Sequence, residues 1–227
     1  MKIDIVSAIP ESIEGYLNYS IIKNAREKGL IQVDLHNLHE YAANKWRRID
    51  DYPFGGDAGM VIQCEPVFNC IEKLKSINVY DEIIYLTPDG ELFNQKIANE
   101  LSLKNNLLLL AGHYKGIDQR IRDTLITREI SIGDYVLTGG ELPALILLDA
   151  IVRLLPGVIG DATSALNDSF QDGLLEAPIY TRPSVYRGME VPKVLLSGNH
   201  KEIEEWKFKL ALEKTKKFRP DMLKDGF

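Results

Sequence analysis

The stretch SIGDYVLTGGE, residues 131–141, follows a β-like run and precedes a long apolar segment. It contains three glycines ahead of a helix that we predict over residues 141–155. Glycines at a strand end let a ligand approach the backbone and pair with its N–H and C=O groups. The stretch therefore predicts a turn from strand into helix that also forms part of a binding site.

Two other predicted strands end in the same way. The run DEIIYL (81–86) leads into TPDG, and the continuous apolar run NLLLLAG (106–112) leads into HYKG. Helical patterns follow at 93–103 and 117–125, and strands that alternate with helices predict a mostly parallel α/β sheet. Ligands of such sheets lie beyond the carboxyl ends of the strands. We therefore expect the loops 85–90, 110–116 and 131–140 to converge on one pocket.

The rest of the chain gives a coarser prediction. Its expected elements are a strand at 2–9, a helix at 10–29, a strand at 30–38, a turn-rich loop at 47–60, a helix at 63–77, a further strand at 127–133 and an amphipathic helix at 199–218. Residues 156–183 show weak periodicity and many polar side chains, which is typical of a functional or mobile connection.

Composition indicates an ordinary globular chain. It has 227 residues, of which 45% are apolar and 26% charged, enough for one large domain or a domain with a small appendage. The longest apolar-rich segment, 142–160, is interrupted by Asp149 and Arg153, so we predict a buried helix and no membrane span. No signal peptide pattern is visible, and Cys64 and Cys70 match no zinc or redox spacing, so we expect a cytoplasmic protein with reduced thiols.

Charge gives a mixed indication about nucleic acids. The net charge of −6 argues against broad affinity for a polyanion, because phosphate neutralisation needs Lys and Arg. The segments KWRR (45–48) and KTKKFRP (214–220) are nevertheless basic, and a local basic patch on an acidic protein suits a selective RNA partner. For the second segment, a solvated helix end explains the lysines equally well.

The glycine loops match neither common phosphate-binding pattern. The sequence has no GxxxxGK[ST], and no GxGxxG follows its first strand. The loops are thus suited to a nucleoside whose tail is not a phosphate chain, and S-adenosylmethionine has that structure. The alternative is that three glycine-rich turns merely close βα units, which would be the better explanation of any one loop alone.

Two side chains are candidates for proton chemistry at a purine. A ring N–H must lose its proton before the nitrogen can accept a methyl group, so a carboxylate base and a nearby guanidinium are needed. Asp168 and Arg153 are of the right types, although a turn residue and a helix C-terminal cation explain them structurally. His113 and His200 are further candidate bases.

Nine motifs appear in order along the chain and together carry a family resemblance. They are DDYPFGGDAGM (50–60), LTPDG (86–90), GHYKGIDQR (112–120), EISIGDYVLTGGE (129–141), DAIVRLLPGV (149–158), DSF (168–170), YTRP (180–183), VPKVLLSGNH (191–200) and RPDML (219–223). From Ile3 to about Leu223 the chain resembles the bacterial tRNA (guanine-N1)-methyltransferases, the TrmD family of the SPOUT superfamily.

The resemblance implies an architecture. It consists of a SPOUT-type parallel sheet with a deep trefoil knot over about 83–155, within a methyltransferase domain at 1–160. A flexible linker at 161–175 and a small C-terminal helical tRNA-binding domain at 176–227 would follow, and the linker would become ordered when tRNA binds. The protein would act as a homodimer whose active site is shared between subunits, with the general base supplied by the partner subunit.

The resemblance also implies a reaction and its residues. The cofactor would be S-adenosylmethionine, and the acceptor N1 of guanosine 37 of tRNA, next to the anticodon and preceded by G. Asp168 would be the general base and Arg153 its assistant. The implied cofactor residues are Tyr85, Leu86, Thr87, Gly112, Tyr114, Ile132, Gly133, Asp134, Tyr135, Val136, Leu137, Gly139 and Gly140. The implied tRNA-binding residues are Asp50, Gly55, Gly56, Ser169, Lys214, Lys217 and Arg219.

Two residues depart from the family pattern. Lys115 stands where the family usually has an acidic residue associated with magnesium, which argues against a metal contribution, and we predict no metal ligand. Asp57 replaces the last glycine of a GGG, and its carboxylate either accepts from the guanine edge or points to solvent. The alternatives to the expected function are a knotted methyltransferase with another RNA target and a non-catalytic RNA-binding relative.

Overall fold

The computed structural model describes residues 1–160, 168–171 and 173–223. The chain divides into two compact units, 1–160 and 161–227, and each is described by itself. Most of the predicted linker, residues 161–167 and 172, lies outside the described residues.

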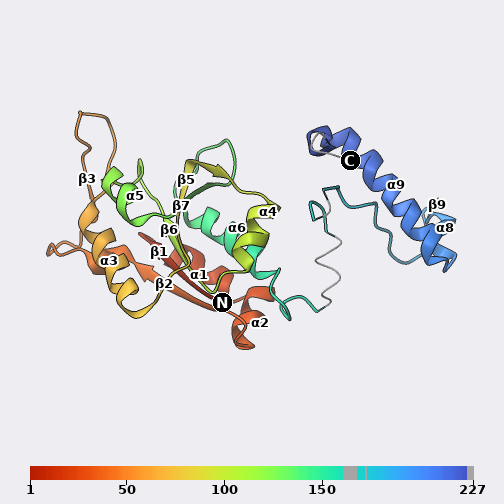
Figure 1. Cartoon of the computed structure of the whole chain (residues 1–227), viewed down its shortest axis with the longest axis horizontal. Coiled ribbons are helices and arrows are strands. Elements are labelled where there is room, and N and C mark those ends of the chain that lie inside the picture. Colours follow the sequence, from red (N-terminus) through yellow and green to blue (C-terminus); the bar gives the residue numbers. More distant parts are fainter. Residues whose placement is uncertain (161–167, 172, 224–227) are drawn as a thin grey trace. The chain divides into compact units, whose positions relative to one another are not determined.

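The first unit is built on a five-stranded sheet in which every pairing is parallel (Figure 1). Its spatial order is β2-β1-β6-β5-β7. The strands are β1 (Lys2–Ser7), β2 (Gln32–Asn37), β5 (Glu82–Leu92), β6 (Asn106–Ala111) and β7 (Arg128–Ser131). The prediction of a parallel α/β sheet is confirmed, whereas the trefoil knot stays a prediction.

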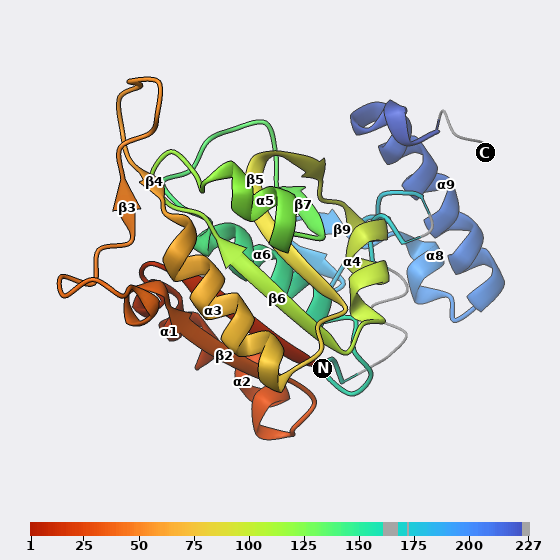
Figure 2. The same ribbon diagram turned by 60° about the vertical axis from the view of Figure 1, so that its left-hand side comes forward.

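Helices cover both faces of this sheet, as the two ribbon views show (Figures 1 and 2). Along β6, Leu107 and Leu109 face one hydrophobic cluster while Leu108 and Leu110 face the other, because successive side chains of a strand alternate. The first cluster includes residues of α1 (Glu11–Leu17), α2 (Ser20–Glu27), α4 (Gln95–Ser102) and α6 (Glu141–Val152). The second includes residues of α3 (Cys64–Ile77) and α5 (Gln119–Leu125).

Strand β5 runs further than predicted, through the segment that we expected to be a loop. Its pairing with β7 jumps from Leu86 to Glu91, both of which lie opposite Ile130, so residues 87–90 bulge out of the ladder. A periodicity argument ends the strand at Leu86, where the apolar run stops. The pairing resumes at Glu91, and the bulge places residues 87–90 at the end of the sheet.

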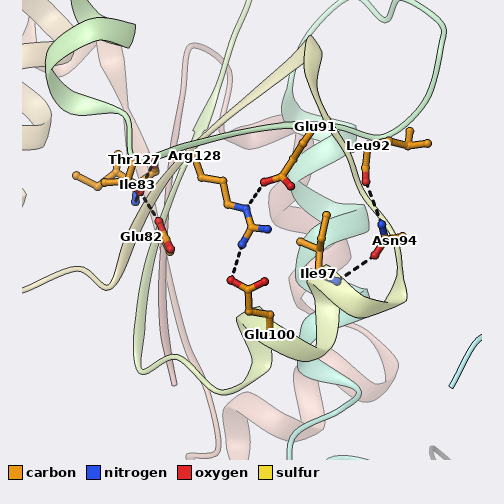
Figure 3. A network of polar contacts seen from close by, with 9 residues as sticks. All are labelled: Glu82, Ile83, Glu91, Leu92, Asn94, Ile97, Glu100, Thr127 and Arg128. Atoms are coloured by element: carbon orange, nitrogen blue, oxygen red, sulfur yellow. Dashed lines mark hydrogen bonds and ion pairs between the residues drawn. The ribbon is translucent and has the colours of Figure 1, made fainter. Parts of the chain in front are cut away.

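An ion-pair network holds the returning part of β5 in place (Figure 3). Arg128 of β7 donates from Nε to Glu91 and from Nη1 to Glu100 Oε1 of α4 at 2.9 Å. The Arg128 side chain is only 15% exposed, so the contact is sheltered and its geometry is restricted. These two carboxylates raise the pKa of Arg128. The network fixes the exit of the bulge against the last turn of α4.

The predicted single helix at 10–29 is wrong, because the structure has two. Asn18 ends α1, Tyr19 has extended backbone angles, and Ser20 opens α2 with a φ of 52°. The break lets Ile13 and Leu17 of the first helix and Ile22 and Ala25 of the second all reach the same core. Apolar spacing alone did not reveal the break, since both halves carry helical periodicity.

A short β-hairpin and a 3-10 helix were not predicted. Strands β3 (Asp50–Asp51) and β4 (Val61–Ile62) pair antiparallel around the glycine-rich stretch, after the 3-10 helix η1 (Leu38–Tyr41). The hairpin is tied to the loop after β6, because Ile62 N–H donates to Gly116 O and Lys115 N–H donates to Met60 O, both at 3.0 Å.

The second unit centres on the long helix α9 (His200–Phe218), which confirms the helix predicted at 199–218. Ahead of it lie the hairpin β8 (Val185–Tyr186) and β9 (Met189–Glu190) and the short helix α8 (Lys193–Leu196); the 3-10 helix η2 (Pro220–Leu223) follows. Asn199 caps α9 by accepting from Glu202 N–H. Within the residues that the structure describes, no helix is both long and apolar enough to cross a membrane.

Candidate functional site

The three predicted segments line one pocket, which lies at the bulge of β5 and at the carboxyl ends of β6 and β7. Its volume is about 650 Å3, including the part open to solvent. The lining residues are Tyr85, Leu86, Thr87, Pro88, Gly112, His113, Tyr114, Lys115, Gly116, Ile130, Ser131, Ile132, Gly133, Tyr135, Val136, Leu137, Thr138, Gly139, Gly140 and Pro143.

The pocket contains every cofactor residue implied by the resemblance except Asp134, which is exposed and does not line it. It also contains residues that were not singled out as cofactor ligands, among them Pro88, His113, Lys115 and Pro143. Most of these are sequence neighbours of an implied residue in the same loop. Counting every residue of each loop as a pocket residue would therefore have included them. Pro143 lies inside α6 and could be found only from the packing of the helix start.

Backbone contacts join the second loop to the third. Gly140 N–H donates to Gly112 O at 2.7 Å, and His113 and Gly139 form an antiparallel bridge. A Cβ on Gly140 would lie 2.7 Å from both Ala111 Cα and Gly112 N. Only glycine permits this approach, so the two loops form one continuous wall.

Tyr85 forms another wall and is fixed by a charged cluster. Its ring is buried, which raises the pKa of its phenol, and the Arg122 guanidinium lies 5.5 Å from the ring centroid. Arg122 is bonded to Glu129 and to Asp89, whose oxygen lies 2.8 Å away. The hydrogen bond from Thr87, followed by Arg122, lowers the pKa of Asp89. The bulge residues are thus tied to α5 and β7.

A buried carboxylate lies against the third loop. Glu141, the first residue of α6, has a side chain that is 8% exposed, and its Oε1 accepts from Ser7 Oγ at 2.7 Å. Its Oε2 is 3.9 Å from His113 Nδ1, which is too far for a hydrogen bond. His113 Nδ1 is buried and has no hydrogen-bond partner among the described residues.

One implied tRNA-binding residue lies beside the second loop. Asp50 of β3 faces Arg48 at 3.6 Å, and both charges act on Tyr114. Partial burial and then Asp50 raise the pKa of Tyr114, which has a φ of 58°. A side chain in this strained conformation at a pocket edge is typical of a functional position.

The other residues of the glycine-rich hairpin lie outside the pocket. Gly55, Gly56 and Asp57 are exposed, and a Cβ on either glycine would meet no atom within 4 Å. Asp57 is exposed in the chain without tRNA, so a hydrogen bond from the guanine edge stays a prediction. Trp46, Tyr52 and Phe54 on the same hairpin region are also largely exposed.

Arg153 does not line the pocket. It is the C-cap residue of α6, whereas Gly140 is the N-cap residue of the same helix. The helix has 12 residues, which corresponds to a length of about 18 Å at ~1.5 Å per residue. One chain therefore holds Arg153 and the pocket at opposite ends of α6.

Asp168 and Ser169 belong to the second unit. Ser169 Oγ accepts from Glu176 N–H at 2.9 Å, and Lys214 of α9 donates to Glu176 O at 2.9 Å. Leu175 N–H donates to Thr215 Oγ1 at 2.8 Å. The segment that carries the candidate base is thus attached to α9.

The implied tRNA-binding cations differ in their surroundings. Lys214 is partly buried by its bond to Glu176 O, and Arg219 forms a two-pronged ion pair with Asp221, which raises the pKa of Arg219. Lys217 is exposed, as is its neighbour Lys216. Across the described parts of both units, no group of three His, Cys, Asp or Glu side chains is arranged to hold a metal ion.

Comparison with known proteins decides the family. The family model described as tRNA (Guanine-1)-methyltransferase TrmD matches residues 1–225. The chain belongs to this family. The TrmD assignment gives the reaction, which is methyl transfer to N1 of a guanine in tRNA.

Relatives match the TrmD chain over nearly its whole length. A protein of Bacteroides fragilis named tRNA (guanine-N(1)-)-methyltransferase is 59% identical over 99% of this chain and 100% of its own length. Proteins with the same name from Bacteroides thetaiotaomicron and Porphyromonas gingivalis are 60% and 58% identical over the same shares. A methyltransferase of this family needs a methyl donor, and the pocket is the candidate site for it.

Proposed function

We propose that this TrmD-family enzyme uses S-adenosylmethionine to methylate N1 of guanosine 37 of tRNA, in the cytoplasm. The observation that carries the proposal is the single pocket formed by loops 85–90, 110–116 and 131–140. Its walls combine apolar side chains with glycine backbone, as is typical of small-molecule sites.

The residues of the pocket fit this donor. An adenine edge both donates and accepts, and the backbone of 132–140 offers both kinds of group. Tyr85, Leu86 and Leu137 supply apolar contact for its faces, and the buried Nδ1 of His113 is a polar atom without a partner in the described structure. When bound, the donor supplies an electrophilic methyl group on a sulfonium.

The chain itself would supply the proton chemistry. Asp168 takes the N1 proton of guanine, which frees the ring nitrogen to accept the methyl group. Arg153 offsets the negative charge that develops on guanine O6. We propose that Asp50, which lies near Tyr114 at the pocket edge, accepts from the guanine edge. Lys115 lines the pocket in place of an acid, so we propose that the enzyme holds no metal there.

Helix α6 supports a homodimer. The helix has apolar residues on its buried and its exposed sides: Leu147, Leu148 and Ile151 are fully buried, whereas Leu142 is 59% and Ile146 45% exposed. These two side chains are four positions apart and share one stripe. We propose that a second copy packs on this stripe. An antiparallel arrangement of two α6 helices would bring Arg153 of one copy to the pocket of the other, which its own chain cannot do.

We predict that the double substitution Leu142→Glu and Ile146→Glu yields a monomer, because two buried charges per subunit would be left without partners in the interface. Light scattering after gel filtration measures the mass. Methyl transfer should fall at least tenfold with the loss of the shared site.

Glutamate substitutions at another exposed pair of apolar residues control for the added charge. Ile77→Glu and Val79→Glu, at the end of α3, should leave mass and activity unchanged. A fully active monomer of the α6 variant would contradict the shared active site.

Two surfaces are proposed for tRNA. Lys216 and Lys217 at the end of α9 are exposed and suit contact with phosphates, whereas Lys214 and Arg219 are engaged within the chain. Trp46, which is 79% exposed, stands within the basic segment 45–48 and offers a face for base stacking.

Mapping of the methylated nucleotide tests the proposed function. The enzyme is incubated with unmodified tRNA and S-adenosylmethionine, and the product is digested and analysed by mass spectrometry. We expect 1-methylguanosine at position 37 in tRNAs that have G at 36, and no product when position 36 is changed. A methyl group at another position would support the alternative of a different RNA target. Tight tRNA binding with no methyl incorporation would support the non-catalytic relative.

A further inference from the structure

The buried carboxylate of Glu141 is the group near the pocket that neither the fold nor the proposed mechanism explains. A side chain that is 8% exposed loses most of its hydration, which is costly for a charge without a cationic partner. Ser7 compensates it through one hydrogen bond and the start of α6 through the helix dipole, while His113 Nδ1 stays 3.9 Å from Oε2, beyond hydrogen-bond distance. Buried ionisable groups cluster at functional sites, which makes Glu141 a candidate for a role in the pocket.

The carboxylate lies behind the wall of the pocket, although Glu141 itself is not a lining residue. Oε2 has no hydrogen bond among the described residues and lies against Gly139, a lining residue. A Cβ on Gly139 would come within 2.1 Å of that oxygen and 2.9 Å of His113 Nδ1. Because Gly139 has no side chain, the carboxylate packs directly against the backbone of this lining residue.

The other charges at the pocket are either paired or of opposite sign. Asp89 is bonded to Thr87 and Arg122, and Lys115 is a cation. Asp134 is exposed and does not line the pocket. Among the described residues, the group of opposite sign that faces Glu141 is the His113 ring, whose Nδ1 lies 3.9 Å from Oε2 and is charged only when protonated.

We propose that Glu141 is the counter-charge for the sulfonium of the methyl donor. This inference rests on the proposed use of S-adenosylmethionine. The donor carries one more positive charge than its product, S-adenosylhomocysteine, and the two are otherwise nearly the same in shape. A buried negative charge under the wall stabilises the donor over the product, because charge interactions are strong in a poorly hydrated site. Glu141 thus makes the site bind S-adenosylmethionine more tightly than S-adenosylhomocysteine, which favours release of the product.

Isothermal titration calorimetry with both compounds tests this role. The parent and Glu141→Gln, which keeps the size and the hydrogen bond to Ser7, are titrated with S-adenosylmethionine and with S-adenosylhomocysteine. We expect the substitution to weaken donor binding about tenfold and to leave product binding unchanged. The melting temperature without ligand should be equal or higher, since a buried charge is removed.

Two control variants separate charge from packing. Ser7→Ala removes the hydrogen bond but keeps the carboxylate, so the preference for the donor should persist. Glu72→Gln makes the same charge change at an exposed position of α3 and should change neither affinity. If Glu141→Gln does not fold, Glu141→Asp replaces it; withdrawal of the charge from Gly139 should then reduce the preference for the donor.

An unchanged ratio of the two affinities, or an equal loss for both compounds, would overturn the inference and make Glu141 a structural residue. If the parent binds neither compound, the proposed function fails instead, so the two failures are distinguishable.

Discussion

Replacing Asp168 with Asn should reduce methyl transfer by about a thousandfold while S-adenosylmethionine binds as before. Asparagine is nearly the same size as aspartate but cannot take the N1 proton, and without that step the ring nitrogen keeps its lone pair in the aromatic system. Single-turnover rates with saturating tRNA measure the chemical step, and calorimetry measures donor affinity. A large loss of rate with unchanged donor affinity identifies Asp168 as the base.

Asp123→Asn is the matched control for that experiment. Asp123 is exposed on α5, its carboxylate accepts from Gln119, and an asparagine oxygen can accept the same bond. Its rate should equal that of the parent. A fully active Asp168→Asn enzyme would refute the assigned role, and a joint loss of rate and donor affinity would show that Asp168 supports the structure.

Replacing Gly140 with Ala should remove donor binding almost completely. The new methyl group would lie 2.7 Å from the backbone of 111 and 112, and neither neighbour is a flexible side-chain end that could move away. The loops 110–116 and 131–140 must then separate, which breaks the 2.7 Å bond between Gly140 N–H and Gly112 O. Overpacking of this kind also costs about 1–3 kcal/mol of stability. Calorimetry and thermal unfolding measure the two effects.

Gly15→Ala is the control for a glycine-to-alanine change at a position where the new methyl group has room. Gly15 lies in α1, where a Cβ would meet nothing within 4 Å, so the variant should be as stable as the parent or slightly more so. Normal donor binding by Gly140→Ala would mean that the contact between the two loops does not shape the site.

Sequence could predict the sheet and the position of the pocket. The unbroken apolar run of β6 indicates a strand buried on both faces, and helices between strands require parallel connections. The carboxyl ends of such strands lie at one edge, which is why the glycine loops after Leu86, Ala111 and Ser131 meet. These inferences depend on local composition and on general rules of chain geometry.

Other features depend on contacts that composition does not record. The return of β5 at Glu91 depends on Arg128 reaching both Glu91 and Glu100. The break before Ser20 depends on how two helices share one core. In the sequence, Glu141 looks like an ordinary acidic residue in the first turn of a helix. Only the structure shows that its side chain points inward. The distance of Arg153 from the pocket appears only when both ends of α6 are placed.

The central claim is that three strand-end loops of one chain hold the methyl donor. A crystal structure of the enzyme with S-adenosylmethionine tests it most directly. We expect density for the nucleoside between Tyr85, Gly112 and Leu137, with its sulfonium on the Gly139 side. Density for the donor elsewhere on the molecule, with these loops vacant, would contradict the account.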